Sequence, residues 1–330
     1  MNRGLEIALL IPWGKIGIAH FMSIFLGLHH TTRYEYDRAV WLGPQAVRLR
    51  PAPHCRTPIS NYALTVEPAQ HSVHWQQDPY ANWLARFVFR ERAVAMSLTV
   101  DLEAEIAPFN PFDFFLEPYA ESWPFTFPPE PREDVAPFLN TLPAGPRLKE
   151  LVSSLPREPQ STIDFLVVLN RRLRHLIRYV TRVEEGVQTP EETLASGVGS
   201  CRDTAWLLAE VLRHAGLPAR FVSGYLIELA ADATRRESEG GVERDHAALH
   251  AWTEVYLPGA GWIGLDATSG LLCGEGHLPL AATPHYRSAA PVTGTVEPCE
   301  VRFSHQINVR RIAKNGGSAA ELKTPARRTR

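Results

Sequence analysis

The sequence predicts an α+β protein in which a strand-rich region precedes a region of helices and strands. Short alternating segments, separated by turn signals, occupy residues 29–107. Residues 161–308 contain amphipathic helical patterns and then three strand patterns. A stretch rich in proline and aromatic residues, 108–160, lies between them. Helices followed by antiparallel strands are typical of the α+β class.

The composition is that of an ordinary globular protein. The chain has 330 residues, of which 45% are hydrophobic and 21% charged, enough for one large or two moderate domains. Its net charge of −2, from 34 basic and 36 acidic residues, predicts neither nucleic acid nor membrane as a partner. The oligomeric state is not predicted.

The four cysteines are far apart and form no zinc-ligand spacing: Cys55, Cys201, Cys273 and Cys299. We therefore expect reduced thiols in a cytoplasmic protein without metal or cofactor.

Residues 1–28 are expected to be an extension outside the fold. The apolar run over residues 5–11 contains Glu6 and is too short to span a membrane. A cleaved signal is the alternative. At the other end, residues 309–330 are basic and lack a core face, so we expect a disordered tail.

The first domain, residues 29–107, is expected to be a small antiparallel β-sandwich. Strands are predicted over residues 29–36, 46–50, 62–67, 71–76, 83–90 and 96–106. The connecting segment, 108–160, carries too many prolines for long helices or central strands. Its many rings suggest that it lies across both domains, with a short helix over residues 146–154. A longer helix is predicted over residues 162–179.

The second domain is organised around the run G-V-G-S-C-R-D-T-A-W-L-L over residues 197–208. It predicts a helix that begins at Cys201, with Ser200 as N-cap, and ends before Gly216 and Pro218. A thiol at a helix N-terminus meets the positive end of the helix dipole, which favours thiolate. Cys201 is therefore a candidate nucleophile.

A cysteine nucleophile needs a base and a group that orients the base. Strands are predicted over residues 220–229, 249–257 and 261–266, and the last two carry His250 and Asp266. If Leu257 pairs with Gly261, Asp266 lies opposite Trp252 and diagonally next to His250. A working pair therefore predicts an odd-numbered loop or a bulge at the glycines of this hairpin.

Other features have more ordinary interpretations. His246 and His250 have the spacing of a zinc helix but lack its glutamate and lie at a strand, so no metal is predicted. Arg202 and Asp203 are expected to pair in the first helical turn. The tryptophans at 206, 252 and 262 are expected mainly in the core, and the three cysteines other than Cys201 are interpreted as structural.

Three blocks of this region resemble the transglutaminase-like superfamily: G-S-C-R-D-T-A-W-L-L, L-P-A-R-F-V-S-G-Y-L and H-A-W-T-E-V-Y-L-P-G-A-G-W-I-G-L-D-A-T. The resemblance covers roughly residues 162–270, and the β-rich first part is similar to the N-terminal domain of bacterial members. It implies a papain-like core with Cys201 as nucleophile, His250 as base and then acid, and Asp266 as the group that fixes the imidazole tautomer. Many relatives have proline where this chain has Ala267.

The resemblance implies a cysteine-dependent amide hydrolase or acyl transferase that acts on peptides or proteins, with hydrolysis favoured over cross-linking. Tyr179 is a candidate oxyanion donor, and Trp252 is a candidate substrate contact. Two alternatives stay open. The fold could be a catalytically idle binding module, or the aromatic connecting segment could cover Cys201 until it is displaced.

Overall fold

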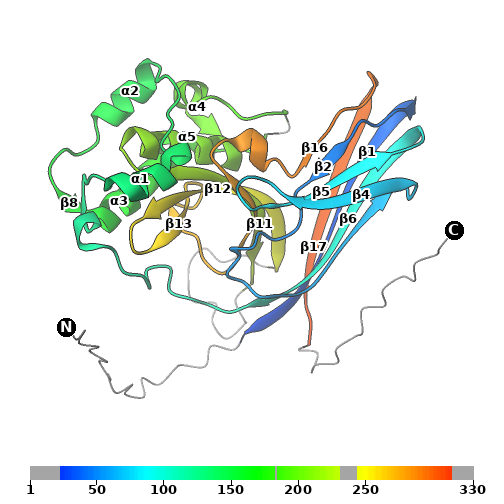
Figure 1. Ribbon diagram of the computed structural model, residues 1–330, viewed down its shortest axis with the longest axis horizontal. Coiled ribbons are helices and arrows are strands. Elements are labelled where there is room, and N and C mark those ends of the chain that lie inside the picture. Colours follow the sequence, from blue (N-terminus) through cyan, green and yellow to red (C-terminus); the bar gives the residue numbers. More distant parts are fainter. Residues whose placement is uncertain (1–22, 183, 231–243, 314–330) are drawn as a thin grey trace, which may run out of the picture.

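The computed structural model describes residues 23–182, 184–230 and 244–313. Two regions lie side by side: a strand-rich domain and a domain of helices around a further sheet (Figure 1). None of the helices in these described ranges is long and apolar enough to cross a membrane.

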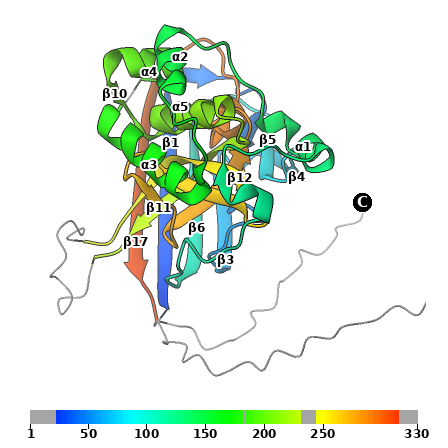
Figure 2. The ribbon, with the colours of Figure 1, turned by 90° about the vertical axis from the view of Figure 1, so that its left-hand side faces the viewer.

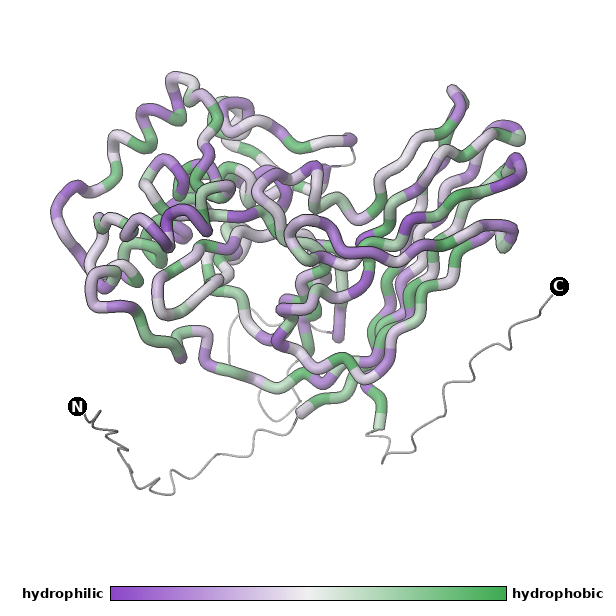
Figure 3. The backbone as a smooth tube through the Cα atoms, in the orientation of Figure 1, coloured by the Kyte–Doolittle hydropathy of each residue, from purple (hydrophilic) through white to green (hydrophobic). Residues whose placement is uncertain are grey.

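The strand-rich domain consists of two four-stranded antiparallel sheets. One has the order β17-β1-β6-β3 and the other β16-β2-β5-β4. The strands of the first sheet are β1 (Ile24–Val40), β3 (Ile59–Glu67), β6 (Ala93–Ile106) and β17 (Val301–Arg311). Those of the second are β2 (Gln45–Val47), β4 (His71–Gln77), β5 (Trp83–Phe89) and β16 (Val292–Thr293). Polar and apolar residues alternate along the long strands, as expected when only one face of a sheet is buried (Figure 3).

Strand β17 changes the domain boundaries expected from the sequence. It pairs with β1 from Leu26↔Arg311 to Tyr36↔Val301, and Figure 2 shows the two strands side by side. The expected boundary at residue 308 therefore falls inside a strand of the first domain, and residues 309–311 belong to that strand. Similarly, β1 begins at Ile24, within the expected extension. Residues 1–22 and 314–330, the rest of the expected extension and tail, lie outside the described residues.

The second domain is built on a five-stranded antiparallel sheet of order β14-β13-β12-β11-β15. Its strands are β11 (Ala219–Glu228), β12 (His246–Leu257), β13 (Gly261–Asp266), β14 (Leu271–Leu272) and β15 (His277–Thr283). Its helices are α2 (Pro146–Ser153), α3 (Thr162–Leu176), α4 (Pro190–Ser196) and α5 (Cys201–His214), with a 3-10 turn η3 (Tyr286–Ala289). Two short ladders, β7 (Ser122–Trp123) with β8 (Gln160–Ser161) and β9 (Arg178–Tyr179) with β10 (Val198–Gly199), complete it.

Helix α5 is the central element of this domain. Nearly all its residues are buried, and the Thr253 hydroxyl of β12 donates to the Ala205 carbonyl at 2.6 Å. At its far end, the buried Arg213 pairs with Glu210 at 2.8 Å and donates to the Ala219 carbonyl at 2.9 Å. Both ends of the helix are thereby held against the sheet.

The two domains share a core and several polar contacts. Side chains of β11 and β15 pack into the same hydrophobic cluster as the sandwich strands. The buried His30 of β1 forms a hydrogen bond of 2.8 Å with the Tyr225 hydroxyl of β11. The Asn82 side chain accepts from the Ala282 N–H at 2.8 Å and donates to the Ala282 carbonyl at 3.1 Å, as a paired strand would. The edge strand β15 is thus covered by a turn of the first domain.

The connecting segment contains short helical pieces, η1 (Pro118–Ala120), α1 (Pro129–Asp134) and η2 (Ala136–Phe138). Phe138 contacts Tyr80 of the first domain and Trp262 of the second, at ring-centroid distances of 5.9 and 4.8 Å. Trp123 stacks on Phe165 of α3 with centroids 3.7 Å apart. The segment therefore does lie across both domains.

Candidate active site

The nucleophile candidate Cys201 is the first residue of α5, as the sequence predicts. The preceding helix α4 ends at Gly197, whose φ of 63° is the left-handed conformation that suits glycine. The chain then pairs β10 with β9 before it enters α5. The backbone N–H groups of the first helical turn have no intrahelical acceptors, and the helix dipole adds partial positive charge there. The thiol lies at this positive end and is half-buried.

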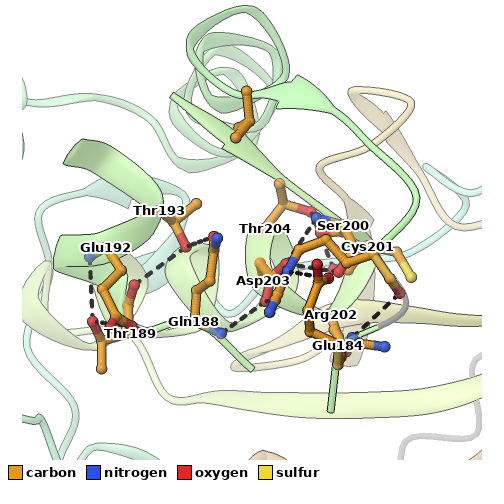
Figure 4. A network of polar contacts seen from close by, with 12 residues as sticks. Glu184, Gln188, Thr189, Glu192, Thr193, Ser200, Cys201, Arg202, Asp203 and Thr204 are labelled. Atoms are coloured by element: carbon orange, nitrogen blue, oxygen red, sulfur yellow. Dashed lines mark hydrogen bonds and ion pairs between the residues drawn. The ribbon is translucent and has the colours of Figure 1, made fainter. Parts of the chain in front are cut away.

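The Asp203 side chain connects the start of α5 to the loop before it through hydrogen bonds (Figure 4). Its carboxylate accepts from the backbone N–H and hydroxyl of Ser200 at 2.8 and 2.7 Å and from the Gln188 N–H at 2.8 Å. Arg182 pairs with the same carboxylate at 2.7 Å. These contacts outweigh the cost of burial and hold the pKa of Asp203 below its usual value.

The expected first-turn pairing of Arg202 with Asp203 is wrong. The partner of Asp203 is Arg182, while Arg202 donates to the backbone carbonyl of Glu184. Adjacent helical residues do not face each other, so a loop residue could reach the carboxylate more easily.

His250 is placed by β12, whose neighbour is β11. In this ladder His250 lies opposite Gly224. A Cβ added at Gly224 would come within 2.4 Å of the Trp252 ring. The glycine thus leaves room for Trp252, which is stacked at 6.4 Å from the His250 ring and supports it.

The β12–β13 hairpin has the register predicted for a contact between His250 and Asp266. Leu257 pairs with Gly261 and Thr253 with Leu265, so the loop has three residues and Asp266 continues toward Trp252. Gly259 and Gly261 adopt φ values of 89° and 77°. The His250 Nε2 and Asp266 Oδ2 atoms are 3.2 Å apart. The predicted diagonal contact is therefore formed.

Asp266 is held from several sides. The Thr268 N–H and hydroxyl donate to its Oδ1 at 2.8 and 2.7 Å. The buried Asn170 of α3 donates to the Asp266 and Leu271 carbonyls at 3.3 and 3.0 Å. The carboxylate is thus oriented with Oδ2 toward His250.

The charges of this group are coupled. Burial alone lowers the pKa of His250, but its hydrogen bonds with Asp266 and Cys201, together with their negative charges, raise that pKa to about 10. Burial alone raises the pKa of Asp266, but the donor groups of His250, His277 and Thr268 that face it hold the pKa well below its usual range. Because Nε2 faces Asp266, Nδ1 is the ring nitrogen available to Cys201.

The two weaker candidates have different surroundings. Tyr179 lies on β9, opposite Gly199 and 46% exposed, and the negative charge of Cys201 contributes to a raised pKa of its hydroxyl, after burial. It stays a candidate oxyanion donor. Trp252 is 1% exposed, and its indole N–H donates to Glu254 at 3.4 Å. Its ring packs against those of His250 and His277 and exposes little surface to a substrate, so its role as a substrate contact stays a prediction.

One site residue was not predicted: His277, the first residue of β15, whose Nε2 is 3.6 Å from Asp266 Oδ2. The strands predicted from the sequence end at residue 266, before β15. The apolar run H-L-P-L-A-A-T, after two glycines, is the signal that could have identified it.

The other cysteines lie in different surroundings. Burial raises the pKa of Cys55 to about 11 and raises that of Cys273 as well. Both shifts favour the unreactive thiol over thiolate.

Comparisons with known proteins agree with this architecture. Residues 26–105 match the bacterial transglutaminase-like N-terminal region, and residues 149–267 match the transglutaminase-like superfamily. An uncharacterized protein of Mycobacterium tuberculosis is 26% identical over 277 residues, which cover 81% of this chain and 86% of that one. An uncharacterized protein of Mycobacterium leprae is 34% identical over 96 residues, 29% of this chain and 31% of the relative.

Among solved structures, a "Putative Cysteine Protease from Cytophaga hutchinsonii" aligns with a TM-score of 0.65. The alignment covers 89% of this chain and 92% of that one at 15% identity, so it concerns the fold. The protein thus joins a bacterial transglutaminase-like N-terminal region to a transglutaminase-like core, and it belongs to the transglutaminase-like superfamily.

Proposed function

We propose that the protein is a cysteine-dependent hydrolase or acyl transferase that acts on amide bonds of peptides or proteins. The observation that carries this proposal is the contact chain Cys201–His250–Asp266. The thiol begins a helix and, together with Asp266, raises the pKa of His250, whose Nε2 is 3.2 Å from the buried carboxylate. A raised pKa of His250 favours an imidazolium next to a thiolate, which is the reactive form of the pair.

The residues would then act in the following order. The Cys201 thiolate attacks the amide carbonyl, and the positive helix end with the Cys201 N–H stabilises the developing oxyanion. His250 transfers its proton to the departing amine as the C–N bond breaks, which leaves a thioester. Water or an amine attacks this thioester while His250 accepts its proton, and the thiolate leaves. Asp266 keeps the imidazole tautomer and stabilises the imidazolium throughout.

Hydrolysis is the favoured outcome. The structural neighbour from Cytophaga hutchinsonii carries the name of a cysteine protease, although it shares only the fold with this chain. The connecting segment contacts α3 through Trp123, and the Glu117 N–H donates to the Pro258 carbonyl of the β12–β13 turn at 2.9 Å. This turn is the end of the hairpin away from His250, so the contact gives no support to a covered site.

The test is site-resolved alkylation of the full chain with iodoacetamide, followed by mass spectrometry, across pH 5 to 9. Cys201 is expected to react faster than Cys55 and Cys273 throughout this range, because the helix N-terminus and the His250 imidazolium favour its thiolate. Cys55 and Cys273 serve as internal references, since burial raises the pKa of both. His250→Ala should remove the fast reaction at Cys201, and His74→Ala, at an exposed histidine of β4, should leave it unchanged.

If Cys201 reacts no faster than Cys55 and Cys273, the enzyme proposal is wrong and the binding-module alternative replaces it. If Cys201 is reactive, a protein substrate offered with a fluorescent primary amine separates the two outcomes. Cleaved or deamidated substrate without incorporated amine supports hydrolysis, and incorporated amine supports transfer.

A further inference from the structure

His277 is a second histidine beside Asp266, next to His250. It begins β15 and lies opposite Leu226 of β11. Its ring packs edge-on against Trp252, with ring centroids 5.2 Å apart, and its side chain is 12% exposed. The two histidines thus approach one carboxylate oxygen, Oδ2, from two different strands, with Nε2 distances of 3.2 and 3.6 Å.

The backbone fixes the tautomer of His277. The Gly274 N–H donates to His277 Nδ1 at 3.2 Å. A backbone N–H can only donate, so Nδ1 must be the acceptor, and the single proton of the neutral ring is on Nε2. Protonation of Nδ1 would break this contact. The ring is therefore held as a neutral donor whose N–H points toward Asp266.

The tautomer of His277 also indicates whether the group of His250, Asp266 and His277 binds a metal ion or orients the Asp266 carboxylate. The ligating atoms of His250, Asp266 and His277 lie within 4.8 Å of one another, a spacing that could hold a metal ion. A metal-bound histidine donates with its other ring nitrogen, whereas His277 accepts there. The Nε2 atom is buried, and among the described residues it has no hydrogen-bond partner. Asp266 Oδ2 lies 3.6 Å from this atom, which is 0.4 Å farther than it lies from His250 Nε2.

We propose that His277 is a positioning residue, a second neutral donor that keeps Asp266 oriented toward His250. The proposal rests on the proposed function. During turnover His250 alternates between imidazolium and imidazole, and the carboxylate loses its charged partner each time the proton leaves. The His277 N–H, which keeps its proton, can shorten its contact and compensate. Asp266 then does not turn away, and His250 Nδ1 stays directed at Cys201.

Two nearly isosteric variants separate this role from a purely structural one. In His277→Gln the amide nitrogen can occupy the place of Nε2 and donate to Asp266. In His277→Asn the amide oxygen can occupy the place of Nδ1 and accept from Gly274, but no donor reaches Asp266. His277→Phe keeps the ring contact with Trp252 and lacks both polar contacts. The rate of Cys201 alkylation and the thermal midpoint are measured for each full-length variant.

We expect the glutamine variant to keep most of the wild-type rate, and the asparagine and phenylalanine variants to lose on the order of tenfold, the cost of a misplaced reactive group. If asparagine preserves the rate as well as glutamine does, or if phenylalanine has no effect, the inference is overturned while the proposed function stands. A wild-type Cys201 without fast alkylation contradicts the proposed function and this inference together. If one variant has a much lower thermal midpoint than the wild type, the conclusion rests on the comparison of the glutamine and asparagine variants alone. General unfolding would not restore the alkylation rate in only one of these two.

Discussion

Two buried histidines of this protein have pKa values that are shifted in opposite directions. His30, at the contact between the domains, is 1% exposed, and its pKa is lowered to about 4, first by burial and then by the charges of His305 and His29. His250 has a side chain that is only 8% exposed, yet its pKa is raised to about 10. Burial disfavours the imidazolium at both positions.

The partners account for the difference. The ring nitrogens of His30 contact two hydroxyl groups, Tyr225 at 2.8 Å and Thr32 at 2.9 Å, which satisfy hydrogen bonds without supplying charge. His250 instead has a carboxylate 3.2 Å from Nε2, and the negative charges of Asp266 and Cys201 raise its pKa. His30 of the sandwich is a neutral side chain that connects the two domains, whereas His250 of the second domain is the charged partner of a carboxylate. The lesson is that the contacting groups, and not the degree of burial, indicate the role of a buried histidine.

The largest expected effect comes from neutralising the partner of His250. Asp266→Asn should lower the rate of Cys201 alkylation near pH 6 by about a hundredfold or more, because an amide does not stabilise the imidazolium and can impose the wrong tautomer. Site-resolved mass spectrometry measures this rate. Glu254→Gln is the matched control, since Glu254 is also a buried carboxylate of this sheet but pairs with Arg220 at 2.6 Å. If the Asp266→Asn protein kept the wild-type rate, the difference between the two histidines could not be attributed to their contacting groups.

A second effect concerns stability in acid. Above pH 6.5 His30 is neutral in both states, but between 6.5 and about 4 the unfolded chain binds a proton that the folded protein does not. His30 should therefore reduce the free energy of unfolding as the pH falls through this window, by up to about 3 kcal/mol at 1.36 kcal/mol per unit of pKa. Urea denaturation at pH 7 and at pH 4.5 measures the loss.

The comparison variant is His30→Gln, which keeps a polar side chain but cannot titrate. It should lose less stability between the two pH values than the wild type does, whatever its stability at pH 7. Equal losses in both proteins would show that His30 does not keep its neutral form in the folded state. Carboxylates common to both proteins contribute equally and cancel in this difference.

The smallest effect is the removal of one neutral partner of His30. Tyr225→Phe leaves a buried ring nitrogen without its hydroxyl and should lower the free energy of unfolding by about 1–3 kcal/mol at pH 7. Tyr62→Phe is the control, because the buried Tyr62 hydroxyl has no hydrogen-bond partner among the described residues. Denaturation of both variants should show a loss for position 225 and almost none for position 62. A similar loss at both positions, or none at either, would mean that the hydroxyl contact with His30 makes no specific contribution to the connection between the domains.

Much of the candidate site could be predicted because it depends on neighbours along the chain. Helix capping places Cys201 at the start of α5, and this needs only the residues around it. Strand parity and a three-residue loop place Asp266 beside His250, which needs only one hairpin. Such rules act over a few residues, and each carries a clear pattern in the sequence.

The remaining features depend on segments that are distant in sequence. No local pattern indicates that β17 pairs with β1 across more than 250 residues, as in the pair Leu28↔Val309. The same holds for Arg182 reaching Asp203, for the complete burial of Trp252 against Val222 and Ala282, and for His277 facing Asp266. The sequence by itself determined the order of elements, the nucleophile at a helix start and the histidine–aspartate hairpin, because these follow from local hydrogen bonding and side-chain periodicity. Only the tertiary structure decided which distant strand completes the sandwich and which second histidine faces the carboxylate, because packing selects among many long-range pairings that satisfy the same local rules.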